Sequence, residues 1–380
     1  MKMGLFKPAW MSDNSDNWDK ALKAVEKEKN QAKLHVIAKN APYWKARLDA
    51  TKKITDQTVL ADIAKNNTSE GVRLAAAEKL TDQTLAQKVY ADLAKNASYP
   101  SARIEAAEKL TDQNLAQKTY ADLAKKAYSS ADRKKAVENL TDQVVLADVA
   151  KNDTEWDVRS QAVEKITDQA VLADVLKKDT NYIVRRRAEE KLTDQAALAD
   201  VAKNSTEWDV RSHAVEKLTD QTVLADLAQN DVNMYVRMIA ADKLTDRNSA
   251  QKIFAHIVVV DIGVEKTEEI RAQHAAFDQL TDPVLIADLT KTEKRVYMRD
   301  KIIKKLSLSE FSQDIYADIA KNCIKDHNEY WENGVDHTHD ICMAAFRELT
   351  DQGLIADIAK NSDDGFLRAV AVNELTDKTR

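Results

Sequence analysis

Both cysteines of the chain lie in one short segment, together with three of its seven histidines. The segment covers residues 322–343 and reads NCIKDHNEYWENGVDHTHDICM. Cys323 and His327 are four residues apart, and His339 and Cys342 are three apart, so each pair would share a face if it were helical. Thiolate and imidazole are the ligands that tetrahedral zinc prefers. The segment therefore predicts a structural zinc ion bound by Cys323, His327, His339 and Cys342.

The same segment has two other interpretations. Within the zinc interpretation His337 is a substitute ligand. The spacing matches no standard zinc-finger motif, so a polar surface loop that merely collects histidines is one alternative. A metal-dependent enzyme built on this segment is the other. Two cysteines cannot form a disulfide framework, and in a reducing compartment a cysteine pair beside histidines indicates a metal or thiol site rather than a bridge.

The composition indicates helices and a soluble protein. Gly and Pro together make up only 10 of 380 residues, far below the roughly 12 per cent of average proteins. No stretch approaches the ~18 apolar residues of a membrane span, and the opening residues are polar where a signal peptide is apolar. We therefore expect a cytoplasmic protein. A net charge of −6 and a pI near 5.8 disfavour nucleic acid as the partner.

One short motif recurs along almost the whole chain: an apolar anchor residue followed by Thr-Asp. The anchors are Ile54, Leu80, Leu110, Leu140, Ile166, Leu192, Leu218, Leu244, Leu280, Leu306, Leu349 and Leu375, with a degenerate first anchor at Glu28. Most intervals are 26 residues, two are 30, and the others are 36 and 43. A period of 20 to 50 residues is typical of a solenoid.

Each repeat contains two helical patterns. The first, helix A, starts at Thr167 and Asp168, which are good N-cap residues, and it often ends in Asn, as at Asn152, a residue that tolerates a left-handed C-cap. The second, helix B, follows Thr154 and Asp157, which have the spacing of a capping box. Its apolar face is predicted to comprise Val158, Ala162 and Ile166. The two 30-residue intervals add four residues to helix A, about one turn.

These patterns predict an all-α fold: an α-solenoid of about twelve two-helix repeats. Residues 1–17 form a polar N-terminal segment, and residues 18–380 form one elongated solenoid with an enlarged interhelical loop at 322–343.

The pattern L-A-D-x-A-K-N followed by V-R-x-x-A-x-x-x-L, as between Leu146 and Ile166, resembles the short HEAT-like repeats of phycobilisome-lyase-type proteins. It is also similar to the leucine-rich-repeat variant. The resemblance implies an α-solenoid that binds other molecules, with helix B on its concave face. It does not carry over an activity. HEAT-repeat hydroxylases hold iron with His-Glu dipeptides, which this sequence lacks, and HEAT-like DNA glycosylases need a basic concave face.

An Arg recurs in helix B, and we predict that it lies opposite an Asp of helix A. The arginines are Arg73, Arg159, Arg185, Arg211 and Arg237, and the aspartates are Asp62, Asp148, Asp174, Asp200 and Asp226. One acid and one base per repeat indicate a structural ladder of charge-assisted hydrogen bonds, similar to that of HEAT proteins. A track of arginines that binds phosphate is the alternative.

Two further sets of residues are candidates for partner binding. Aromatic residues recur ten positions before the anchor, at Trp44, Trp156, Tyr182 and Trp208, either packed into the turn between the helices or exposed as a ladder. Positions five and six before the anchor vary between otherwise similar repeats, and they include Gln161, Arg186, Arg187 and His213. Neutral drift on a tolerant surface explains the variation equally well.

The sequence thus predicts a non-enzymatic scaffold that binds a protein or peptide through Gln161, Arg186, Arg187, His213, Trp156, Tyr182 and Trp208. It indicates no cofactor other than structural zinc, no membrane insertion, and neither the identity of the partner nor the oligomeric state.

Overall fold

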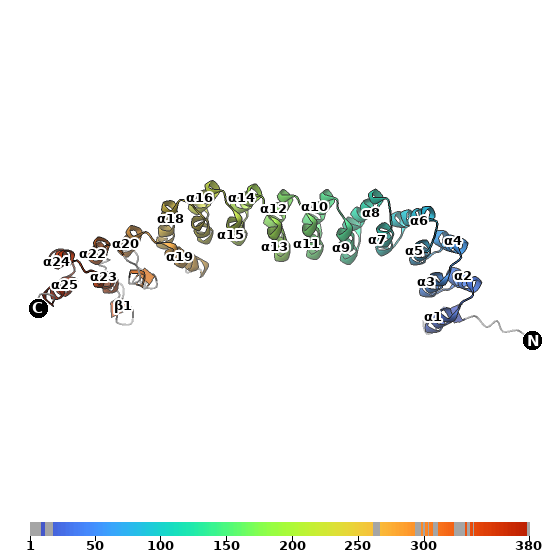
Figure 1. The fold of residues 1–380 in the computed structure, drawn as a ribbon, viewed down its shortest axis with the longest axis horizontal. Coiled ribbons are helices and arrows are strands. Elements are labelled where there is room, and N and C mark those ends of the chain that lie inside the picture. Colours follow the sequence, from blue (N-terminus) through green and yellow to red (C-terminus); the bar gives the residue numbers. More distant parts are fainter. Residues whose placement is uncertain are drawn as a thin grey trace, which may run out of the picture. The chain divides into compact units, whose positions relative to one another are not determined.

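The computed structural model describes residues 9–11, 18–260, 267–292, 298, 301–302, 304–306, 311–322, 331–332, 335–336 and 338–377. The chain divides into two compact units, Met1–Leu192 and Thr193–Arg380, and each is described by itself. In both units the chain forms consecutive pairs of antiparallel helices, so that the even-numbered helices form one layer and the odd-numbered helices the other (Figure 1). Even-numbered helices correspond to helix A and odd-numbered helices to helix B.

The first unit contains a short 3-10 helix and thirteen described α-helices. Their bounds are η1 (Ala9–Met11), α1 (Trp18–Lys27), α2 (Gln31–Asn40), α3 (Trp44–Lys53), α4 (Gln57–Asn66), α5 (Glu70–Glu78), α6 (Gln83–Asn96), α7 (Pro100–Glu108), α8 (Gln113–Lys126), α9 (Ser130–Asn139), α10 (Gln143–Asn152), α11 (Trp156–Lys165), α12 (Gln169–Lys178) and α13 (Tyr182–Lys191). Within this unit the stack of helices changes direction at α6 to α8, and the odd-numbered helices lie on the inner side of the bend (Figure 1).

The second unit continues the same pairing and adds a small hairpin. Its described elements are α14 (Gln195–Asn204), α15 (Trp208–Lys217), α16 (Gln221–Asn230), α17 (Met234–Asp242), α18 (Arg247–Val259), α19 (Thr267–Gln279), α20 (Pro283–Thr292), α22 (Gln313–Asn322), β1 (Trp331–Glu332), β2 (Val335–Asp336), α23 (Thr338–Arg347), α24 (Gln352–Asn361) and α25 (Gly365–Asp377). The strands pair antiparallel, with Trp331 opposite Asp336.

The anchor residues form the core between the two layers. Ile54, Leu140, Leu192, Leu218, Leu280 and Leu306 are completely buried, and of the apolar anchors only the last, Leu375, is partly exposed. Burying one Leu or Ile side chain contributes about 1.5–3 kcal/mol, but a single helix pair has no second surface to cover it. Stacking supplies that surface, which confirms the predicted all-α repeat solenoid.

The helix ends differ in part from the predictions. Asp168 is the N-cap of α12 and accepts hydrogen bonds from the N–H groups of Ala170 and Val171, as expected for helix A. The predicted capping box of helix B is wrong, because α11 begins after Glu155, whose side chain makes no cap bond. The left-handed C-cap is also wrong, since the residue after Asn152 has an extended backbone (φ −64°, ψ 139°).

In most of the described helices A, a glutamine binds the next repeat; α20 contains none. Oε1 of Gln143 accepts hydrogen bonds from the backbone N–H (3.0 Å) and the hydroxyl (3.1 Å) of Thr167, and its Nε2 donates to the carbonyl of Lys165 (3.2 Å). The same bonds join Gln31 to Thr55, Gln57 to Thr81, Gln87 to Thr111, Gln117 to Thr141, Gln195 to Thr219, Gln221 to Thr245 and Gln313 to Thr350. The Gln of the Thr-Asp-Gln motif is therefore a link between repeats.

The longer helices α6 and α8 keep this link by moving it one turn along the helix. In α6 the residue directly after the N-cap, Gln83, donates only to the carbonyl of Leu80, whereas Gln87 binds Thr111 of the next repeat. The four inserted residues thus supply a second Gln at the position where the neighbouring repeat can be reached.

This shift makes a matched pair of substitutions informative. We expect Gln87→Ala to lower the free energy of unfolding by about 1 kcal/mol, because three hydrogen bonds to the next repeat are lost. Gln83→Ala should cost clearly less, since its bond stays at the start of its own helix. Urea denaturation followed by circular dichroism measures both. An equal loss for the two variants would contradict the assigned role of Gln87.

A lysine before the anchor completes the contact between neighbouring odd-numbered helices. Its ammonium group donates to carbonyls in the last turn of the preceding helix B, as Lys243 does to Glu216 (2.5 Å) and Lys305 to Phe277 (2.7 Å). Unpaired carbonyls make the C-terminal end of a helix negative, so a cation is stabilising there. These bonds hold successive odd-numbered helices in register and so position the side chains of their exposed face.

Candidate protein-binding surface

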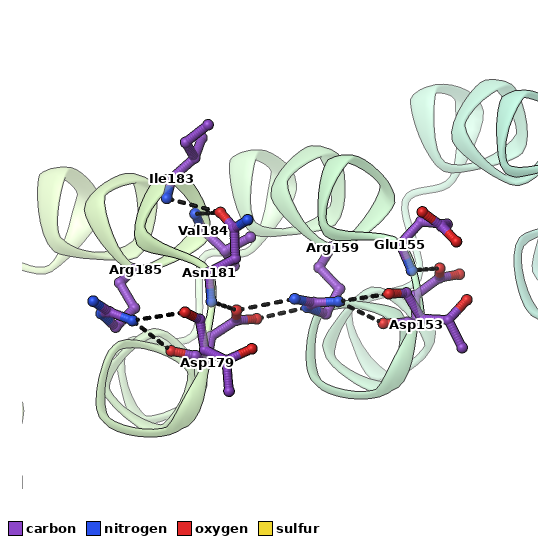
Figure 2. Close-up of polar contacts among 10 residues, drawn as sticks. Asp153, Glu155, Arg159, Asp179, Asn181, Ile183, Val184 and Arg185 are labelled. Carbon is purple, nitrogen blue, oxygen red and sulfur yellow. Dashed lines mark hydrogen bonds and ion pairs between the residues drawn. The ribbon is translucent and has the colours of Figure 1, made fainter.

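Buried Arg-Asp pairs join successive repeats beneath the exposed face of the odd-numbered helices. Nε and Nη2 of Arg159 donate to the two carboxylate oxygens of Asp179 at 2.6 and 3.0 Å, while Nη1 donates to the carbonyl of Asp153 at 2.8 Å (Figure 2). The Arg159 side chain is 12% exposed and that of Asp179 only 5%. The carboxylate of Asp179 also accepts the N–H of Asn181, which shapes the turn before α13. Arg133 with Asp153 and Arg211 with Asp231 repeat the arrangement.

The aspartates predicted to pair with these arginines were the wrong ones. Arg159 binds an Asp of the next repeat, twenty residues further along the chain, and not Asp148 of its own repeat. Arg73 likewise binds Asp92 of the longer repeat that follows it (2.6 Å) rather than Asp62. The Arg side chain is long enough to span the interface between repeats. The ladder therefore connects neighbouring repeats and not the two helices of one repeat.

The aspartates of helix A form a second ladder with lysines of the preceding helix A. Lys125 binds Asp148 at 2.6 Å, and Nδ2 of Asn152 donates to the same carboxylate at 2.8 Å. Equivalent ion pairs join Lys39 to Asp62, Lys151 to Asp174, Lys203 to Asp226, Lys291 to Asp318 and Lys321 to Asp357. The recurrent Asn at the end of helix A thus orients a carboxylate, which the sequence patterns had not indicated.

The buried arginines leave little for a phosphate to bind. In Arg133, Arg159 and Arg211 the guanidinium donates to an Asp carboxylate and to backbone carbonyls. The Asp partner raises the pKa of Arg133 and Arg159, because its hydrogen bonds favour the charged form. At these three positions the ladder is structural.

The recurrent aromatic residues are exposed at the N-termini of odd-numbered helices. Trp156 is the first residue of α11 and is 43% exposed, while Tyr182 at the start of α13 is 60% exposed. Trp156 precedes the buried Val158 by two residues, a rotation of about 200°, so its ring lies away from the core face. The interpretation that these rings are packed into the turn between the helices is wrong, and the exposed alternative holds.

The predicted variable residues of the first unit lie on the same two packed helices. Gln161 is half-buried on α11, and Arg186 and Arg187 follow on α13. Arg187 binds Glu164 of α11 at 2.7 Å, and Arg186 binds Glu190 of its own helix at 3.2 Å. The basic run is therefore partly neutralised by exposed glutamates, and Arg187 also links two repeats.

In the second unit two predicted residues line one small pocket. Trp208 and the exposed His213 both lie on α15, and the pocket of about 240 Å³ also includes Tyr235 of α17 and Arg271 of α19. The rings of Trp208 and Tyr235 meet edge to face, with centroids 5.6 Å apart. This geometry provides an aromatic surface beside groups of both charges.

The predicted zinc ligands fall largely outside the part of the chain that the structure describes. Cys323, His327 and the side chain of His339 are not described, and Cys342 is buried in α23 with its sulfur in a disulfide bond. The described residues include no group of three His, Cys, Asp or Glu side chains placed to bind a metal ion. The expectation of a metal or thiol site rather than a bridge is therefore wrong for this structure. Zinc binding requires free thiolates and stays a prediction for the reduced chain. The hairpin β1–β2 within this segment was not predicted.

The fold defines the class of protein: an all-α repeat solenoid whose described helices stack in pairs. No protein-family model matches the sequence, and no curated protein matches it. One similar solved structure is described as "Computational Design of Self-Assembling Cyclic Protein Homooligomers". The two chains are 15% identical, and the match covers 84% of this chain and 100% of the other chain, with a TM-score of 0.11. Within the described part of the chain, no helix has both the length and the apolar character needed to cross a membrane.

Proposed function

We propose that this protein is a non-enzymatic scaffold that binds a protein or peptide on the exposed face of its odd-numbered helices. The observation that carries the proposal is the recurrence of exposed aromatic rings at the N-termini of those helices. Trp and Tyr are the residues that most often dominate the affinity of protein interfaces. Exposing them repeatedly on a water-soluble surface is costly unless a partner covers them.

The ladders between repeats support this role by making the surface rigid. The Gln, Lys and Arg bonds described above fix each odd-numbered helix against the next, so neighbouring rings keep a set spacing. Preorganised side chains lose less conformational entropy when a partner binds. The similarity of the repeat to HEAT-like motifs favours the same face, since helix B lines the binding surface of that fold.

The described carboxylates with lowered pKa values also fit a structural role better than a catalytic one. The pKa of Asp148 is lowered mainly by the hydrogen bond from Lys125, and that of Asp174 mainly by Lys151. These groups belong to the ladder of helix A, on the layer opposite the aromatic rings. An enzyme built on residues 322–343 is the alternative function, and no described contact favours it.

A selection for peptide ligands tests the proposal. Random 12-residue peptides displayed on phage are selected on the full chain, and the affinities of the recovered peptides are measured by fluorescence anisotropy. We expect Trp156→Ala combined with Tyr182→Ala to weaken binding of a subset of these peptides by at least ~10-fold, because aromatic anchors contribute most of the binding energy. The control is Val144→Ala, a 79% exposed residue of the other layer. Recovery of no specific peptide, or equal binding by both variants, would contradict the proposal.

A further inference from the structure

The first unit contains a groove that none of the sequence patterns indicated. It lies across α3, α5 and α7 and has a volume of about 1020 Å³. Leu74, Ala75 and Ala102 form its apolar floor, and Trp44 and Tyr99 line it from α3 and from the N-terminus of α7. Helices pack about 8–10 Å apart, so three of them span roughly 20 Å. An extended segment of about six residues covers that distance at ~3.3 Å per residue.

The longer helices of the neighbouring layer account for the opening. Helices α6 and α8 have 14 residues, whereas α4 and α10 have 10, and the stack bends at this place (Figure 1). The ion pairs between repeats are more exposed to solvent here: the side chain of Asp92 is 46% exposed, whereas that of Asp179 is 5% exposed. The odd-numbered helices beside these longer helices, α5 with α7 and α7 with α9, pack less closely than α3 with α5 or α11 with α13.

Small side chains keep the groove open at its centre. Gly71 lies in α5, where other repeats have residues such as Asp157, and a Cβ atom built on it meets no other atom within 4 Å. Ser69, Ser98 and Ser101 also line the groove. Glycine within a helix costs about 0.5–1 kcal/mol relative to alanine, and here it leaves space that a large side chain would fill.

Aromatic rings are exposed at two places along the groove. Trp44 is 51% exposed and Tyr99 is 70% exposed, although both border an apolar floor. Flat rings of this kind bind the apolar stems of a partner's side chains and also attract cations to their faces.

The charges on α5 and α7 decide the chemistry of the partner. These helices contribute Glu70, Glu78, Glu105 and Glu108. Two lysines lie near them: Lys109, which lines the groove and binds Glu78 at 3.0 Å, and Lys135 of α9, whose ammonium is 4.0 Å from Glu108. The carboxylate of Glu70 accepts a hydrogen bond from the backbone N–H of Tyr99 at 3.2 Å, which fixes it at the edge of the groove. Glu105 is exposed; Lys109 acts on it electrostatically, but no ion pair within 4.0 Å joins it to another described residue. The α5–α7 end of the groove is therefore acidic, whereas α3 contributes Arg47 and Lys52.

We infer that this groove binds an extended peptide segment of about six residues that combines apolar side chains with lysine or arginine. The inference rests on the proposed function and names a place and a partner class for it. Apolar side chains of the segment cover Leu74, Ala75 and Ala102 between the two rings. A basic side chain of the segment lies at the α7 end. There the carboxylate of Glu105 binds its charged group, and the ring of Tyr99 contacts its apolar stem.

The same phage selection on the full chain, with random 12-residue peptides, tests this inference through three variants. Gly71→Trp fills the groove, Tyr99→Ala removes a ring, and Glu105→Lys reverses the charge at the acidic end. We expect a class of recovered peptides rich in Lys or Arg together with apolar residues. Their affinity should fall at least ~10-fold in each variant, and their binding should weaken at 0.5 M NaCl. Gly71→Ala is the matched control and should bind like the parent, because its single methyl group enters open space.

The possible outcomes separate the inference from the proposed function. Circular dichroism and melting temperature first establish that each variant is folded. If all recovered peptides depend on Trp156 and Tyr182 but bind the three groove variants normally, the groove is not a binding site. The proposed function would then still hold. Recovery of acidic or uncharged peptides only, or dimerisation of the chain that Gly71→Trp abolishes, would assign the groove to another occupant and overturn the inference. The absence of any specific peptide would overturn both.

Discussion

Arg159→Ala is expected to lower the stability of the first unit by about 3–5 kcal/mol, the largest effect of any single substitution considered. The change leaves Asp179 buried without its guanidinium partner, and an unpaired buried charge is strongly destabilising. Hydrogen exchange is the suitable measurement, because a repeat array can open locally and need not unfold in one step. Protection should fall most in α11 to α13, the helices that the Arg159–Asp179 pair joins.

Two comparisons make this prediction specific. Arg73→Ala should cost about 1 kcal/mol, because its partner Asp92 is nearly half exposed and water can replace the lost hydrogen bond. Arg159→Met combined with Asp179→Leu should recover much of the loss, since an apolar pair of similar size needs no counter-charge. Equal losses for Arg159→Ala and Arg73→Ala would show that burial of the pair is not what matters.

Acid should destabilise the whole array through the ladder of helix A. The aspartates of helix A have pKa values below the ordinary 3.8, because cationic or amide side chains bind their ionised form. They are the ladder residues Asp62, Asp148, Asp174, Asp226, Asp318 and Asp357, and also Asp92 and Asp122, which bind Arg73 and Arg103. A carboxylate whose pKa is lower in the folded chain contributes stability that is complete above the unfolded value and is lost as the pH falls through the folded value. The melting temperature should therefore change little between pH 7 and about pH 5 and drop steeply below about pH 4.

Circular dichroism melts between pH 7 and pH 2 measure this dependence. Lys125→Met combined with Lys151→Met removes the largest cause of the lowered pKa at Asp148 and Asp174, so the acid-dependent drop should become shallower. High salt should reduce it as well, because these ion pairs are partly exposed to solvent. A melting temperature that already falls steeply above pH 5 would assign the transition to other groups.

Local features of the fold were predictable from the sequence. The apolar anchors, such as Leu140 and Ile166, recur at a fixed period and are buried as expected. Asp168 and its equivalents cap helix A because the bond from a side chain to the second or third following N–H lies within one turn. Both signals depend on residues that are close in the chain, and the 3.6-residue period of a helix then identifies the buried face.

Features that depend on the contact between repeats were not predictable in the same way. The partner of Arg159 is Asp179 and not Asp148, because the guanidinium group reaches across the interface to the next repeat. The role of Gln143 depends on Thr167, 24 residues away, and the Thr-Asp-Gln motif alone does not reveal which repeat that Gln contacts. The exposure of Trp156 likewise depended on how α11 packs against its neighbours.

The sequence by itself therefore determined the repeat, its two helices and the apolar core, since these follow from periodicity and from contacts within a few residues. The tertiary structure decided which charges are paired, which aromatic rings remain exposed and where a groove opens. The groove at Gly71 is the clearest example: it opens where α5 and α7 pack less closely and where α6 between them is one turn longer than α4. That separation depends on the relative placement of whole helices and is encoded in no single residue of the groove.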